Sequence, residues 1–134
     1  MTSTVWSRVN DVATREAVIV PPEISLRKVA DVMAGHDIGA VIVGTTRNVL
    51  GIVSERDIVG ALAAGADPDQ ATAAGAMSVA VVSVRPTDTV YDVAVDMLDL
   101  GIRHVPVLDV RGEVLGMVSV RDLLRPLMTG SFER

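Results

Sequence analysis

Two Ser-x-x-Asp pairs are the residues whose types and spacing could do chemistry. Ser54 and Asp57 form the first pair, and Ser119 and Asp122 form the second pair 65 residues further along the chain. A helix that starts at such a serine offers free backbone N–H groups and a dipole, which favour a phosphate group. The serine hydroxyl adds a donor, and the aspartate carboxylate can accept hydrogen bonds from both hydroxyls of a ribose. If each helix start faces a cleft, the pairs predict a site for a ligand that carries ribose and phosphate.

The same spacing also has a purely structural interpretation. A serine at the N-cap and an acid three residues later form a capping box, which stabilises a helix by about 1 kcal/mol. For one isolated pair, this is the commoner explanation. The occurrence of two pairs at matching positions favours a ligand role in at least one of them, and both interpretations stay open.

Arg56 and Arg121 each stand directly before one of the two aspartates. Adjacent residues of a helix do not share a face, so each arginine points elsewhere than the aspartate that follows it. Each is therefore a candidate for ligand binding, for a surface salt bridge or for a contact between two copies of the chain.

Arg103 and His104 form the most polar spot beside a predicted buried strand. A guanidinium offers a planar fork for phosphate oxygens, and an imidazole can add a donor. The alternative is that both residues are simply exposed to solvent at the start of the strand and bind nothing. Gly39 and Ala40 stand at the matching positions of the first half, so two pockets built on these halves cannot be equivalent. The sequence does not settle which pocket gains the basic residues.

Val20 ends a short β-branched run and Val84 ends the matching stretch Val82-Ser83-Val84, and each is followed within two residues by a proline. Side chains of this kind could line a pocket for an adenine ring, although most such residues are simply part of the core.

The sequence gives little support for catalysis or metal binding. The chain has no cysteine, and its two histidines, His36 and His104, lie at unmatched positions, so no two-histidine metal motif forms. We predict no catalytic residue, no metal site and no enzymatic activity.

The elements that must position these residues occur twice. Residues 50–57 read LGIVSERD and residues 115–122 read LGMVSVRD, which indicates two copies of one unit. Each half reads strand, helix, strand, strand, helix, with a parallel crossover followed by a hairpin. The predicted strands are 18–20, 41–43 and 49–53, then 82–84, 105–107 and 114–118. The predicted helices start after Ser25, Ser54, Thr89 and Ser119, and Pro126 limits the last one. The fold class is α/β of the α+β type, with the two repeats packed as a pseudo-two-fold pair.

Composition sets limits on function. The chain has 134 residues, of which 49% are hydrophobic and only 2% aromatic, so it can build a core but offers few stacking platforms for single-stranded nucleic acid. A net charge of -5 argues against a broad surface that binds the phosphate backbone of a nucleic acid. No apolar run approaches the ~20 residues of a membrane span, and the N-terminus lacks the pattern of a secretory signal. We expect no membrane association, no nucleic-acid partner and a cytoplasmic location.

Each half resembles the cystathionine β-synthase (CBS) domain, and the pair resembles a tandem CBS, or Bateman-type, module. The matching features are a valine shortly before a proline, Ala-x-x-Met on the first helix, an apolar strand after Gly39 or Gly101, and Gly-x-Val-Ser-x-x-Asp. The resemblance covers about residues 9–130, with one domain at 9–65, a connector at 66–76 and a second domain at 77–130. It is closest to small stand-alone CBS proteins of bacteria.

The resemblance implies a regulatory module that binds adenosine nucleotides in the cleft between its halves. Ser54, Asp57, Ser119 and Asp122 would then bind the ligand, and AMP, ADP or ATP is expected more than S-adenosylmethionine. No cofactor is required. With no catalytic domain attached, the module would act on a separate, unidentified protein. The alternative is a ligand-free structural or interaction module of the same fold.

The helices after each Ser-x-x-Asp pair carry more apolar residues than one internal sheet pairing can cover. They include Ile58, Val59, Leu62, Leu123, Leu124 and Leu127. Two-fold pairing of the whole module would bury this surface, so we predict a homodimer.

Overall fold

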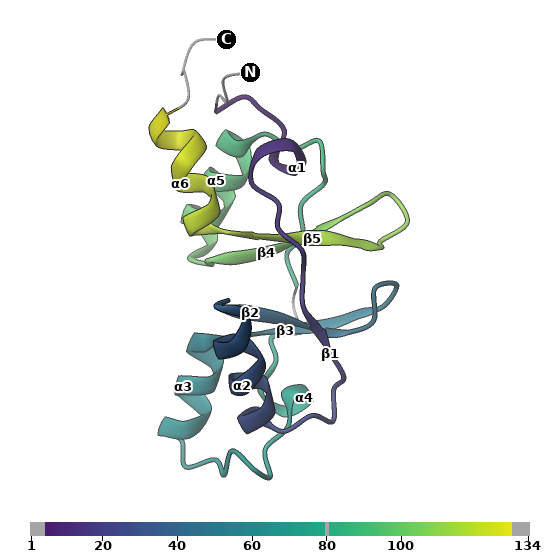
Figure 1. Ribbon diagram of the computed structural model, residues 1–134, viewed down its shortest axis with the longest axis vertical. Helices are drawn as coiled ribbons and strands as arrows, with labels where there is room; N and C mark the ends of the chain where they lie inside the picture. Colours follow the sequence, from purple (N-terminus) through teal and green to yellow (C-terminus); the bar gives the residue numbers. More distant parts are fainter. Residues whose placement is uncertain (1–4, 80, 130–134) are drawn as a thin grey trace. The chain divides into compact units, whose positions relative to one another are not determined.

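The computed structural model describes residues 5–79 and 81–129 (Figure 1). The chain divides into two compact units, one formed by Val18–Val81 and the other by the residues up to Ala17 together with those from Val82 onward. Both units combine a small sheet with helices that cover one of its faces (Figure 1). This confirms a mixed α/β fold built from two repeats.

The unit formed by Val18–Val81 contains a three-stranded sheet in the order β1-β2-β3. β1 (Ile19–Val20) pairs in parallel with β2 (Ala40–Gly44), and β2 pairs antiparallel with β3 (Val49–Ser54), as the crossover and hairpin predict. The helices of this unit are α2 (Leu26–His36), α3 (Glu55–Ala63) and α4 (Ala73–Ala76).

Local sequence explains where α2 begins and which face it buries. The Ser25 hydroxyl accepts a hydrogen bond from the Lys28 backbone N–H, so Ser25 is the N-cap that the sequence predicts. Leu26, Val29 and Met33 are buried, as their helical spacing predicts. The hydrophobic core of the unit combines Val29 and Met33 of this face with one valine or more from each strand and with one residue of α4; these are Val20, Val41, Val43, Val53 and Ala73.

The other unit contains the antiparallel pair of β4 (His104–Leu108) and β5 (Val114–Ser119). Its helices are α1 (Val9–Val12), α5 (Val90–Leu100) and α6 (Val120–Thr129). Thr89 caps α5 by accepting a hydrogen bond from the Asp92 backbone N–H, and the buried face of α5 repeats that of α2. α6 continues through Pro126 instead of ending there, so the predicted limit of this helix is wrong.

The predicted strand at 82–84 forms only a single parallel bridge, between Val84 and Val107. In the first half, the N–H of Ile42 donates to the carbonyl of Val18 at 2.9 Å and extends β1 against β2. Pro106 stands at the position of Ile42 in the second half and has no N–H to donate. The carbonyl of Val82 therefore lacks the equivalent bond, and the ladder stops at Val84.

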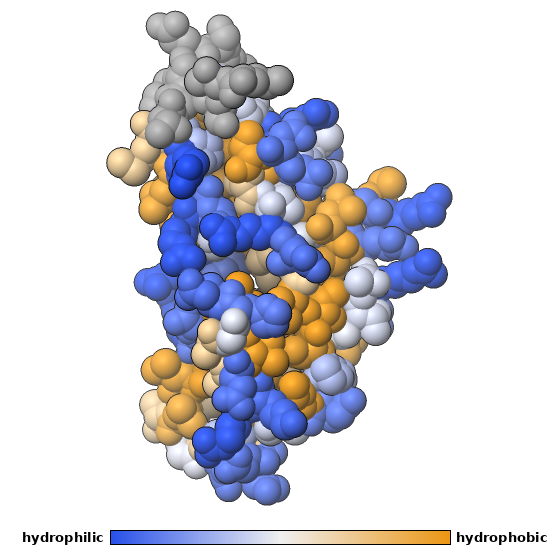
Figure 2. Space-filling view, in the orientation of Figure 1, coloured by the Kyte–Doolittle hydropathy of each residue, from blue (hydrophilic) through white to orange (hydrophobic). Residues whose placement is uncertain are grey.

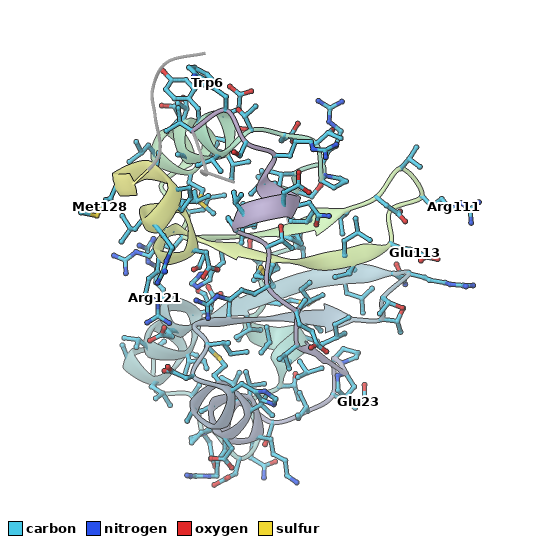
Figure 3. All side chains as sticks on the ribbon, turned by 45° about the horizontal axis from the view of Figure 1, so that its top comes forward. Trp6, Glu23, Arg111, Glu113, Arg121 and Met128 are labelled. Atoms are coloured by element: carbon cyan, nitrogen blue, oxygen red, sulfur yellow. The ribbon has the colours of Figure 1, made fainter. Side chains whose placement is uncertain are left out.

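The two helical turns α1 and α4 are exchanged between the sequence repeats, because each packs in the unit built mainly from the other repeat. The Val9 N–H donates to the carbonyl of Asp88 at 2.8 Å, and the Ala73 N–H donates to the carbonyl of Ile24 at 2.8 Å. Val9 and Ala73 each open one sequence repeat, yet each is buried in the core built on the other repeat. Trp6 belongs to the same exchanged segment as Val9, and its ring lies 5.2 Å from that of Tyr91 (Figure 3).

The compact units combine residues from both predicted repeats, 9–65 and 77–130, and the predicted connector at 66–76 belongs to the unit formed by Val18–Val81. Residues 9–17 pack with the second repeat, because Val9 and Ala13 are apolar and complete its core. The predicted connector contains α4 and packs with the first repeat. Among the described residues, no helix is both long and apolar enough to cross a membrane.

Candidate ligand-binding site

Ser54 and Asp57 form a complete capping box at the start of α3. Asp57 Oδ2 accepts hydrogen bonds from the Ser54 backbone N–H at 2.8 Å and from the Ser54 hydroxyl at 3.0 Å. In return, the Asp57 backbone N–H donates to Ser54 Oγ at 3.4 Å. These bonds fix the orientation of the carboxylate. Within the described part of the chain, Asp57 Oδ1 has no hydrogen bond or ion pair.

Ser119 and Asp122 repeat this arrangement at the start of α6. Asp122 Oδ2 accepts a hydrogen bond from the Ser119 backbone N–H at 3.1 Å, and the Asp122 backbone N–H donates to Ser119 Oγ at 3.1 Å. The other carboxylate oxygen differs, because Asp122 Oδ1 forms an ion pair with Arg15 Nε. The Asp122 side chain is only 7% exposed, whereas that of Arg15 is 62% exposed.

Arg103 and His104 lie at the same end of the β4–β5 pair as the second capping box. The register places His104 opposite Ser119, and the Val120 backbone N–H donates to the carbonyl of Arg103 at 2.8 Å. The corresponding bond in the first half joins the Glu55 N–H to the carbonyl of Gly39, where no basic side chain is present. Arg103 and His104 therefore lie beside the start of α6 in their unit, whereas Gly39 and Ala40 occupy the matching positions beside the start of α3.

Arg56 and Arg121 are exposed in the first turns of α3 and α6. Figure 3 shows Arg121 at the helix-start end of its sheet, while Arg111 lies at the opposite end, on the turn between β4 and β5. Val20 and Val84 are buried in the cores of their units, with 4% and 5% of their surface exposed. Within the described residues, no group of three or more His, Cys, Asp or Glu side chains could hold a metal ion.

Comparison with known protein families identifies the repeat. The model of the CBS domain matches residues 9–64 and matches again at residues 73–129. The chain belongs to the CBS domain family. Each match begins with one of the exchanged helical turns, α1 or α4, so a CBS repeat in sequence extends over both compact units.

Individual relatives agree with this assignment. An uncharacterized 17.7 kDa protein of Acidianus ambivalens is 35% identical over 123 residues, which cover 91% of this chain and 74% of the relative. A CBS domain protein of Pyrobaculum aerophilum, solved as a complex with AMP, is 32% identical with a TM-score of 0.80, and the match covers 95% of this chain and 92% of that one. The CBS domain pair of protein MJ0100, solved with 5-methylthioadenosine and S-adenosyl-L-methionine, is 26% identical with a TM-score of 0.79 over 89% and 94% of the two chains.

The candidate ligand-binding residues predicted from the sequence do not include Arg15, which pairs with Asp122 of the second capping box. Arg15 lies more than a hundred positions before Asp122 in the sequence, and its approach depends on the exchange of the α1 segment. No motif contains it. A signal becomes visible only when residues 9–15 are compared with residues 73–78, because the second stretch has no arginine.

Proposed function

We propose that this CBS protein is a regulatory sensor that binds an adenosine nucleotide at the start of α3. The observation that carries the proposal is the carboxylate of Asp57, which the capping box holds rigidly while Oδ1 stays free of partners in the described chain. A fixed carboxylate oxygen is the acceptor that a ribose hydroxyl requires. The ligands of two solved relatives, AMP and S-adenosyl-L-methionine, share the adenosine group with the nucleotides proposed here.

The proposed roles of the remaining residues follow their chemistry. Ser54 adds a hydroxyl, and the first backbone N–H groups of α3 favour a phosphate. Arg56, in the first turn of α3, is an exposed cation beside this helix start, and Arg103, His104 and Arg121 are the basic residues beside the start of α6 in the other unit; a cation at either helix start would favour phosphate oxygens. This preference for anionic groups is why AMP, ADP or ATP is proposed before S-adenosylmethionine, whose sulfonium is a cation.

The module would transmit the signal through a homodimer to a separate protein in the cytoplasm, with no reaction of its own. Hydrophobic side chains reach the surface over α3 and α6 (Figure 2). The exposed members on these helices are Val59, Leu62, Val120, Leu124 and Met128. Two-fold pairing of these surfaces would remove them from water and would connect the ligand site, at the start of α3, to the interface.

A specific observation favours the alternative, a ligand-free interaction module. Both capping boxes are complete without any ligand, and a capping box needs no further role to stabilise its helix. The alternative predicts that nucleotides leave the protein unaffected.

Thermal unfolding in the presence of AMP, ADP, ATP and S-adenosylmethionine separates the two functions, with inorganic pyrophosphate, which has no ribose, as the control for nonspecific anion binding. A ligand present at 100 times its dissociation constant stabilises the folded state by about 2.7 kcal/mol. The sensor predicts a rise in melting temperature with at least one adenosine compound. No rise with any of them at millimolar concentration would leave the interaction module as the better account.

A further inference from the structure

The two aspartates differ at one equivalent atom. Oδ2 accepts the N–H of the capping serine in both halves, at 2.8 Å for Asp57 and 3.1 Å for Asp122. Oδ1 of Asp122 is paired with the guanidinium of Arg15, whereas Oδ1 of Asp57 has no partner within the described residues. The same acceptor is therefore occupied in one half and open in the other.

The exchanged segments explain the difference. Arg15 forms a single antiparallel bridge with Met117 of β5, and Ser78 forms the same bridge with Ile52 of β3. Both bridges consist of two backbone hydrogen bonds, at 2.9 and 2.8 Å for Arg15 and at 2.9 and 3.1 Å for Ser78. Arg15 and Ser78 thus occupy equivalent backbone positions. A serine side chain is too short to span the distance that the arginine side chain spans to Asp122.

We infer that Arg15 closes the second ribose site by occupying Asp122 Oδ1, so that each chain binds one nucleotide, at Asp57. This inference rests on the proposed function and adds the choice of site. The Asp122 carboxylate and the Arg15 guanidinium carry opposite charges, and their attraction is screened less than that of a fully exposed pair, because the Asp122 side chain is only 7% exposed. A ribose hydroxyl is a neutral donor, so it cannot compete on equal terms for this oxygen. The burial of Asp122 restricts its approach further.

Calorimetric titration of the full chain with AMP, and in parallel with ATP, tests the inference through the number of sites. The wild-type protein should bind one nucleotide per chain, and Arg15→Ser should bind two. The reciprocal change Ser78→Arg should close the first site and leave no nucleotide bound. Arg8→Ser is the matched control, because Arg8 is also an exposed arginine of the N-terminal segment that pairs with an aspartate, but its partner Asp11 belongs to neither capping box. This control should still bind one nucleotide.

The outcomes separate this inference from the proposed function. If the wild-type chain binds one nucleotide and Arg15→Ser gains none, Arg15 does not close the second site, although the sensor stands. If the wild type binds none and Arg15→Ser binds one, the closure is correct and the proposed site at Asp57 fails. If neither binds, both fail. A folding defect is recognised by circular dichroism, and Arg15→Gln, which keeps an unbranched polar side chain but removes the positive charge, then replaces Arg15→Ser with the same expected gain.

Discussion

The backbone of Ser78 lies directly against Gly51. A Cβ atom added at position 51 would come within 2.6 Å of the Ser78 carbonyl oxygen. In the other unit, a Cβ at Gly116 would collide with the carbonyl oxygen of Arg15. This contact explains why glycine occurs in both copies of the repeated motif: each glycine admits the backbone of an exchanged segment that bridges to the next strand residue.

Gly51→Ala and Gly116→Ala should therefore each lower the free energy of unfolding by about 1–3 kcal/mol, since the backbone on the opposite side cannot yield as a flexible side chain would. Gly35→Ala is the control, because nothing lies within 4 Å of a Cβ at this position in α2. In the helix, that change should raise stability by about 0.5–1 kcal/mol. Urea unfolding measures all three. Equal stability of Gly51→Ala and the wild type would mean that Ser78 does not lie against β3.

The ion pair between Arg27 and Asp69 should depress the pKa of the Asp69 carboxyl. Arg27 Nε donates to Asp69 Oδ1 at 2.5 Å, and Nη2 donates to Oδ2 at 3.1 Å. This hydrogen bonding lowers the pKa of Asp69 below its usual 3.8. The resulting stabilisation is present above the unfolded pKa of about 3.9 and is lost as the pH falls through the lower folded value. Both side chains are exposed, so salt should weaken the effect.

Carboxyl NMR titration checks this prediction. In the wild type, the pKa of Asp69 should lie below its usual 3.8, because the Arg27 guanidinium donates to its carboxylate. The pKa of Asp69 should return to the ordinary range in Arg27→Gln. An unchanged Asp69 titration in that variant would show that the pair does not form in solution.

The homodimer proposed above depends on exposed leucines of α3 and α6. Leu62 and Leu124 are each 47% exposed, and a glutamate at either position would carry a charge into the proposed interface. Leu62→Glu and Leu124→Glu should convert the dimer to monomers, whereas Leu98→Glu on α5, at an 82% exposed position, should not. Light scattering measures the mass. A wild-type particle of 14.1 kDa at micromolar concentration would contradict the dimer.

Much of the fold follows from local sequence. The helical spacing of Val29 and Met33 predicts the buried face of α2, and the apolar run at 41–43 predicts a buried strand. Both predictions are confirmed because the periodicity of a helix or strand decides on which of its faces each residue lies. The capping box at Ser54 is equally local, and the structure contains it as expected.

The remaining features depend on contacts distant in sequence. The exchange of α1 and α4 brings Val9 to Asp88, and no periodicity in either segment encodes that partner. Arg15 reaches Asp122 only through this exchange. The shortened pairing at Val84 is different, because Pro106 is visible in the sequence and its missing N–H could have predicted the loss.

The central claim, that Asp57 binds the ribose of an adenosine nucleotide, is tested most directly by calorimetry on Asp57→Ala. Thr89→Ala is the matched control, because Thr89 also caps a helix but belongs to neither of the two Ser-x-x-Asp capping boxes. Both changes should cost about 1 kcal/mol of stability as lost caps. Asp57→Ala should also weaken nucleotide binding about 10- to 150-fold, which corresponds to a lost charged hydrogen bond of roughly 1.5–3 kcal/mol. Thr89→Ala should bind as tightly as the wild type. Unchanged nucleotide affinity in Asp57→Ala would contradict the account and place the ligand elsewhere.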